Sequence, residues 1–195
     1  MKVLNVGGGS NRTLPKEYAG WEQDLLDVDA SLRPDILCDA RHMSALPAEQ
    51  YDAVFCSHTL EHFYQHEIPQ VLEGFLHVLK LEGFAHIIVP DMEALFQALV
   101  KDGRDVHDIW YVSPAGPITF YDVLYGWGRQ VEIGNFYYCH KTGFTPKALF
   151  AALTKTGFRQ CAIAKDGFNL FGYGFKSRPH EDQLVRLGLK HAHLP

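Results

Sequence analysis

A glycine-rich turn directly follows the first apolar run of the chain. Gly7, Gly8 and Gly9 come after residues 3–6, and Asp29 closes the next apolar run, 20 positions beyond Gly9. Glycines let a backbone leave a strand sharply and approach a ligand closely. A carboxylate that ends the neighbouring strand can accept hydrogen bonds from two vicinal ribose hydroxyls. This pairing therefore predicts a ligand of the nucleotide type.

A second group of polar residues follows the apolar run that ends at Cys56. Ser57 and His58 come immediately after it, and Glu61 and His62 follow a few residues later. Because parallel strands place ligands beyond their carboxyl ends, we expect Ser57 and His58 to face the same ligand as the glycine turn. We expect Glu61 and His62 to cap the loop by hydrogen bonding to backbone amides.

Residues 58–62 also match His-x-x-Glu-His, a pattern of zinc hydrolases in which two imidazoles hold the metal and the glutamate activates water. Such a site needs both histidines on one continuous helix. His58 instead follows an apolar strand directly, as a loop residue beside a ligand would. The sequence therefore predicts no metal site.

Apolar runs that end in polar residues alternate with segments of helical period. Strands are expected over residues 3–6, 24–29, 34–39, 51–56 and 84–89, and helices over 68–81, 92–100 and 146–156. Thr145 and Pro146 are typical of a helix start, and Gly157 of its end. The alternation predicts an α/β fold with a Rossmann-like, doubly wound, mostly parallel sheet of about seven strands.

Three segments depart from this alternation. Residues 15–19 offer only a weak helical stretch between the first two strands, so the first crossover helix is expected to be attenuated. Asp166-Gly167 predicts a tight antiparallel hairpin at one edge of the sheet. Residues 104–144 are rich in aromatic residues and are expected to form an insertion that covers the substrate as a lid.

Length and composition limit the function classes. The chain has 195 residues, of which 47% are hydrophobic and 21% are charged, so a single domain over residues 1–195 is expected. A net charge of -5 provides no broad cationic surface for nucleic acid. The sequence shows neither a signal-peptide pattern nor a membrane-length apolar run, which predicts a cytoplasmic protein without membrane contact. Aromatic residues of the insertion could supply a homodimer face.

In order and spacing, these motifs resemble those of the class I S-adenosylmethionine-dependent methyltransferases, particularly small members related to methyltransferase domain 11. Residues 5–9 resemble the first motif, an acid followed by Gly-x-Gly, and residues 28–31 the ribose-binding motif. Residues 51–54 and 57–62 resemble the fourth motif, and residues 79–83 and 89–91 the fifth. The resemblance covers residues 1–176. Asn5 departs from it, because the family usually has an acid there.

The resemblance implies S-adenosylmethionine as the cofactor. The residues implied to contact it are Gly7, Gly9, Asp29, Asp39, Ala40, Ser57 and His58. The reaction implied is methyl transfer to oxygen or nitrogen of a small-molecule or glycan-type acceptor, with His58 and His140 as candidate acid–base groups. Methyl transfer mainly requires alignment and exclusion of water, with a base only where the acceptor holds its proton tightly. The family's Asn/Asp-Pro-Pro-aromatic signature is absent, which argues against nucleic acid as the acceptor.

Three other functions stay open. Asn5 in place of the acid is compatible with a protein that binds S-adenosylmethionine without catalysis. A NAD-dependent oxidoreductase is disfavoured because position 12 is Arg rather than the third glycine of Gly-x-Gly-x-x-Gly. Tyr137 and Lys141 have the spacing of short-chain dehydrogenases, but the surrounding glycines disfavour the helix that would align them. A zinc hydrolase is the remaining alternative.

Overall fold

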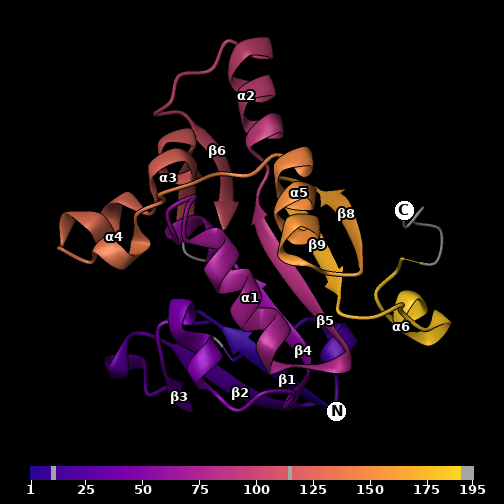
Figure 1. Ribbon diagram of the computed structural model, residues 1–195. Helices are drawn as coiled ribbons and strands as arrows, with labels where there is room; N and C mark the ends of the chain where they lie inside the picture. The colour runs from indigo at the N-terminus through magenta and orange to yellow at the C-terminus, as the bar shows by residue number, and fades with distance from the viewer. Residues whose placement is uncertain (10–11, 114–115, 190–195) are drawn as a thin grey trace.

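The computed structural model describes residues 1–9, 12–113 and 116–189 (Figure 1). Within this part of the chain, one seven-stranded sheet has the order β3-β2-β1-β4-β5-β9-β8. The strands are β1 (Lys2–Val6), β2 (Glu22–Asp27), β3 (Ile36–Leu37), β4 (Tyr51–Ser57), β5 (Leu79–Pro90), β8 (Gln160–Asp166) and β9 (Asn169–Phe175). The first five are parallel, and β9 lies antiparallel between β5 and β8. The predicted Rossmann-like sheet is confirmed.

The connection from β1 to β2 is short, as the sequence predicts. The described residues of this connection hold one 3-10 turn, η1 (Lys16–Tyr18), in place of a helix. Tyr18 is buried there, and its ring lies 5.7 Å from that of Phe55. Leu187, just beyond α6 (Glu181–Arg186), belongs to the same apolar cluster. One large aromatic side chain and the end of α6 thus help to cover this face of the sheet.

Two helices pack together and cover the opposite face, α1 (Ile68–Val78) and α5 (Pro146–Thr156) (Figure 1). Their apolar positions, such as Phe75 and Leu149, are fully buried in the main core. Helix α5 begins at the predicted cap, where Thr145 Oγ1 accepts a hydrogen bond from the Ala148 amide. Helix α1 ends at residue 78 rather than the predicted 81, because Leu79 already pairs with Tyr51 at the start of β5.

The antiparallel hairpin is confirmed, but its turn lies one residue later than predicted. Asp166 pairs with Asn169, so the two loop residues are Gly167 and Phe168. Only Gly167 has a positive φ, of 58°. This pattern is typical of a type II′ turn, which needs glycine at its first central position, rather than the expected turn centred on Asp166-Gly167.

After β5 and α2 (Met92–Lys101) comes the irregular segment of residues 104–144. It contains β6 (Ile109–Ser113), β7 (Gly116–Thr119), α3 (Phe120–Tyr125), α4 (Gly128–Glu132) and η5 (Phe136–Tyr138). Phe120 and Val123 form a small core with Leu95 of α2, separate from the main core. This part lies beyond one end of the large sheet (Figure 1). No helix among the described residues is long and apolar enough to cross a membrane.

Candidate functional site

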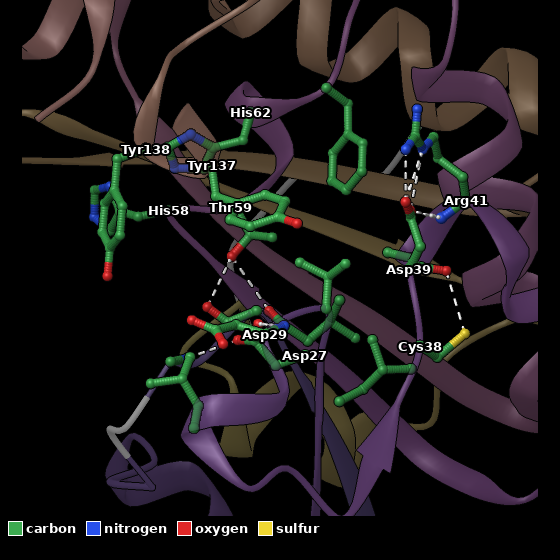
Figure 2. A pocket seen from close by; sticks show the side chains of 18 of the residues that line it. Asp27, Asp29, Cys38, Asp39, Arg41, His58, Thr59, His62, Tyr137 and Tyr138 are labelled. Atoms are coloured by element: carbon green, nitrogen blue, oxygen red, sulfur yellow. Dashed lines mark hydrogen bonds and ion pairs between the residues drawn. The ribbon is translucent and has the colours of Figure 1, made fainter. Parts of the chain in front are cut away.

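A pocket of about 200 Å³ lies beyond the carboxyl ends of β1 to β4 (Figure 2). One wall consists of the loops that follow these strands. The opposite wall comes from the irregular segment, which contributes Asn135, Tyr137, Tyr138 and Lys141. The sheet therefore provides one half of the site and residues 104–144 provide part of the other.

The glycine turn after β1 brings the backbone to the edge of this pocket. Gly7 and Gly9 line it and have positive φ angles of 68° and 61°. A Cβ atom on Gly7 would overlap the side chain of Thr59, and one on Gly8 would lie 2.5 Å from Asn5 Nδ2. A larger residue at position 7 would therefore push apart the turn and the loop after β4, and one at position 8 would displace Asn5 of β1.

Two aspartates at the end of β2 fix the turn and the pocket wall. The buried Asp27 is the last residue of β2, and its carboxylate accepts hydrogen bonds from the Gly9 amide at 3.2 Å and the Asp29 amide at 3.0 Å. Asp29 lines the pocket and caps η2 (Ala30–Leu32) by accepting a bond from the Ser31 amide. This hydrogen bond lowers the pKa of Asp29 below its ordinary value, so the carboxylate is charged at neutral pH.

Sequence reasoning missed the role of Asp27. It placed the end of the strand at Asp29, whereas β2 ends two residues earlier. The sequence does carry a signal for the earlier end, because Asp27 and Asp29 are two acids separated by one residue. A strand buried on both faces would not contain both, so the first acid marks the end of the strand.

Asp39 and Ala40 lie at the far side of the pocket, after β3. Asp39 caps η3 (Ala40–Ala45), and Arg41 Nη2 donates to its Oδ2 at 2.6 Å. Arg41 also donates from Nη1 to Glu67 Oε1 at 2.6 Å, while Ala40 is buried. The Arg41 hydrogen bond holds the pKa of Asp39 below its usual value. Arg41 and Glu67 were not predicted, since nothing in their spacing shows that they meet.

The loop after β4 places Thr59, rather than Ser57, beside the glycine turn. Thr59 Oγ1 lies 3.3 Å from the carbonyl oxygens of Val6 and Gly7 and 3.1 Å from that of Ser57. His58 and Thr59 line the pocket, whereas Ser57 is not among its lining residues. His58 has a φ of 50°, a left-handed conformation that turns the chain at the end of the strand.

Glu61 is buried behind the pocket in η4 (Leu60–His62), with 1% of its surface exposed. Neither of its carboxylate oxygens has a hydrogen-bond partner among the described residues, and His58 Nδ1 lies 3.5 Å from Oε1. The expected bonding of this side chain to backbone amides is therefore wrong. Glu61 instead contacts residues 104–144 through its backbone, because its carbonyl oxygen accepts a hydrogen bond from the Lys141 amide at 2.8 Å.

His62 and His140 lie side by side next to Glu61, with ring centroids 4.8 Å apart. His62 lines the pocket and has its Nδ1 3.0 Å from the Cys139 carbonyl. His140 has its Nδ1 2.8 Å from the Val123 carbonyl and is not among the lining residues. Of the two candidate acid–base residues, only His58 therefore reaches the pocket.

Burial and the Glu61 charge act in opposite directions on these groups. Desolvation disfavours the charged form of His58, but the neighbouring carboxylate of Glu61 raises its pKa above the ordinary value. Burial similarly opposes the charge of Glu61, yet His58 and the neighbouring histidines leave its pKa lowered. For His140, burial dominates and lowers the pKa, so its ring is neutral at neutral pH.

Two alternative arrangements lack the helices that they need. Strand β4 ends at Ser57 and η4 begins at Leu60, so His58 and His62 do not share a helix as in zinc hydrolases. Tyr137 lies in the three-residue η5 and Lys141 lies beyond it. They line the pocket without the common helix on which short-chain dehydrogenases align them.

Comparison with known proteins agrees with this geometry. Residues 7–87 match the family model described as a methyltransferase domain. A S-adenosylmethionine-dependent methyltransferase from Archaeoglobus fulgidus has a similar structure, with a TM-score of 0.57, 16% identity and coverage of 89% of this chain and 85% of that one. Among curated proteins, none matches this sequence significantly.

Two further structures have the same fold and contain ligands. One is a Burkholderia thailandensis 1,6-didemethyltoxoflavin-N1-methyltransferase with S-adenosylhomocysteine, at a TM-score of 0.55, 14% identity and coverage of 91% and 71%. The other is human N-acetylserotonin methyltransferase with S-adenosylmethionine. Its TM-score is 0.56 and its identity 14%, and the match covers 91% of this chain and 48% of that one. Residues 7–87 therefore resemble a methyltransferase domain, and the described chain shares the fold of these S-adenosylmethionine-dependent methyltransferases.

Proposed function

We propose that the protein transfers the methyl group of S-adenosylmethionine to an oxygen or nitrogen atom of a small-molecule or glycan-type acceptor. The observation that carries this proposal is the convergence of Gly7, Gly9 and the charged Asp29 on one pocket. The methyltransferase-domain match supports both the cofactor and the enzymatic activity.

The residues of the pocket fit the chemistry of this cofactor. A Cβ on Gly9 would meet no atom of the described residues within 4 Å, which is compatible with a ligand lying against the turn. One oxygen of Asp29 is held by Ser31, and the carboxylate can accept hydrogen bonds from ribose hydroxyls. The apolar side chains of Val28 and Leu32 line the same region and suit an adenine ring, with Ala40 beyond them.

The opposite wall is suited to the acceptor. Tyr137 and Tyr138 line the pocket opposite the strand ends and can position an organic acceptor while excluding water. In the transfer, a bond forms from the acceptor atom to the methyl carbon, the carbon–sulfur bond breaks, and the acceptor loses its proton. We assign that proton to His58, which lines the pocket and is backed by Glu61.

Two observations favour a small acceptor over a nucleic acid. The chain has a net charge of -5, which is unfavourable for contact with a phosphate backbone. The Burkholderia neighbour, whose match covers 91% of this chain, has bound 1,6-didemethyltoxoflavin, a small molecule. Whether the acceptor atom is oxygen or nitrogen depends on the acceptor that Tyr137 and Tyr138 admit.

The proposal is tested with S-adenosylmethionine carrying a labelled methyl group and a panel of phenols, sugars, carboxylic acids and amines. We expect label to enter one acceptor class, with equimolar S-adenosylhomocysteine produced. His58→Gln should reduce turnover while S-adenosylhomocysteine binding is kept, whereas His66→Gln, a change at an exposed residue outside the pocket, should alter neither. Tight cofactor binding with no label transferred to any member of the panel would contradict the proposed activity.

A further inference from the structure

We infer that Glu61, His62 and His140 form a binding site for one divalent transition-metal ion at the inner end of the pocket. Each residue offers a ligand atom, and these atoms lie within 4.8 Å of one another. The ion-binding site is inferred from these side chains alone and does not require methyl transfer. It differs from the sequence-based expectation of no metal, which considered His58 and His62 as the histidine pair.

The separations are close to those of a coordinated ion. Nitrogen and oxygen ligands about 2.0–2.1 Å from a zinc ion lie roughly 3.4 Å apart in a tetrahedron. The observed upper limit of 4.8 Å therefore requires the three side chains to move inward by about 1 Å or less. Glu61 and His62 are neighbours on η4, so only His140 must come from a different segment.

The hydrogen bonds of the two imidazoles leave a nitrogen free for metal on each ring. His62 Nδ1 and His140 Nδ1 lie 3.0 Å and 2.8 Å from the carbonyl oxygens of Cys139 and Val123. A carbonyl oxygen can only accept, so both Nδ1 atoms donate, and in the neutral rings Nε2 carries the lone pair. A metal-ligating histidine typically has this arrangement, with one nitrogen bonded to a backbone carbonyl and the other to the metal.

The carboxylate of Glu61 provides an independent reason for an ion. Its two oxygens are buried and have no hydrogen-bond partner among the described residues. Burying a carboxylate without hydrogen bonds is costly, and His58, whose side chain is 44% exposed, is only 3.5 Å away through one nitrogen. A divalent cation between Glu61 and the two imidazoles would satisfy this charge.

Two imidazoles and one carboxylate select a particular class of ion. This ligand set suits Zn²⁺, Fe²⁺ or Co²⁺ better than Mg²⁺ or Ca²⁺, which prefer oxygen ligands throughout. Three protein ligands also leave at least one coordination position open. Because His62 lines the pocket, an acceptor oxygen could occupy that position, where the ion would make a hydroxyl more acidic. This last consequence, which favours a hydroxyl acceptor, rests on the proposed function.

The site is tested by adding Co²⁺ to chelator-treated protein and recording the visible absorption of the bound ion, followed by competition with Zn²⁺. We expect one ion per chain and the intense visible bands of a low-coordinate site. Glu61→Gln and His140→Gln should each weaken Zn²⁺ binding by more than the roughly 10–100-fold typical of losing an outer-shell partner. His66→Gln, at an exposed residue of the same segment, should bind like the unaltered protein.

Melting curves of each metal-free variant establish that it is folded. Because the two substitutions lie at different positions, the test still works if one of the two variants does not fold. Failure of the unaltered protein to bind Co²⁺ or Zn²⁺ stoichiometrically would overturn the inference. Binding that is equally tight in folded Glu61→Gln and His140→Gln would also overturn it. Titration of the same samples with S-adenosylhomocysteine separates this result from the proposed function, because cofactor binding uses Asp29 and the glycine turn.

Discussion

The two walls of the pocket hold their polar side chains in different ways. On the strand side, Asp27, Asp29 and Asp39 each accept hydrogen bonds from backbone amides that follow the ends of β1, β2 and β3. On the opposite side, residues 104–144 are held against the loop after β4, because His62 donates to the Cys139 carbonyl and the Lys141 amide donates to the Glu61 carbonyl. The strand wall is thus fixed by the sheet itself, whereas the opposite wall exists only while residues 104–144 stay docked on the loop after β4.

This difference indicates how the site divides its tasks. A wall made from strand ends and short turns keeps one geometry, which suits a cofactor of constant shape. A wall with exposed aromatic residues, such as Tyr137 at 60% exposure, can differ without disturbing the sheet. We therefore expect substitutions in the strand wall to affect cofactor binding and those in the other wall to affect the acceptor.

The largest effect is expected at the glycine turn. Gly7→Ala adds a Cβ that overlaps Thr59, at a φ of 68° that costs a non-glycine residue about 1–2 kcal/mol. We expect the free energy of unfolding to fall by more than this and the affinity for S-adenosylhomocysteine to fall by more than about 1000-fold. Urea denaturation and calorimetric titration measure the two quantities.

Gly20→Ala is the matched control for this variant. Gly20 also has a positive φ, of 80°, but a Cβ there meets no atom of the described part of the chain within 4 Å. It should show the backbone cost of about 1–2 kcal/mol and unaltered cofactor affinity. Equal behaviour of the two variants would show that close approach to Thr59 plays no part.

The next largest effect is expected at His86, a buried imidazole on the other face of the sheet. Burial lowers its pKa, as it does for His140. His86 is 1% exposed, and burial lowers its pKa to about 4 from an ordinary 6.5. The unfolded chain therefore binds the proton more readily, and stability that is complete above pH 6.5 is lost as the pH falls toward 4. The loss amounts to about 3 kcal/mol.

Urea denaturation between pH 7 and pH 4 measures this loss. His86→Phe should remove this part of the pH dependence, although Tyr18 then loses its hydrogen-bond partner. His66→Gln, at an exposed position, should keep the pH dependence. If the His86→Phe protein loses stability on acidification as steeply as the unaltered protein, His86 is not the group responsible.

A smaller effect is expected at Asp29, on the strand wall. Asp29→Ala removes the carboxylate that we assign to the ribose hydroxyls, so S-adenosylhomocysteine should bind roughly 10–100-fold more weakly. Calorimetric titration gives the affinity, and Asp102→Ala, an exposed acid after α2, is the control. An unaltered affinity of Asp29→Ala would place the ribose elsewhere.

The smallest effect is expected at Asp27, which positions the wall rather than contacting the hydroxyls. Asp27→Asn keeps one oxygen for the amides of Gly9 and Asp29 and loses the other. We expect S-adenosylhomocysteine affinity to fall by less than about tenfold. A loss greater than that of Asp29→Ala would reverse the roles assigned to the two aspartates.

Much of the fold can be predicted because the apolar pattern is local. Strands β1 and β4 lie in continuous apolar runs, and Thr145, Pro146 and Gly157 mark both ends of α5. Element ends are harder to predict when a neighbouring strand decides them. The pairing of Leu79 with Tyr51 ends α1 early, and no local signal in residues 79–81 reveals that pairing.

The candidate site was predictable where chemistry follows a strand directly. Gly7, Gly9, Asp29, Asp39, Ala40 and His58 all line the pocket, as their positions after strands suggested. Thr59 lies beside the glycine turn in place of the predicted Ser57, because the left-handed backbone at His58 directs the next residue toward that turn. The approach of His140 to Glu61 depends on how residues 104–144 fold back, which periodicity does not encode.

Calorimetric titration of the protein with S-adenosylhomocysteine, and separately with NAD, tests the central claim most directly. We predict binding of one S-adenosylhomocysteine per chain and no binding of NAD. A protein that is folded yet binds NAD, or binds neither compound, would contradict the assignment of this pocket to S-adenosylmethionine.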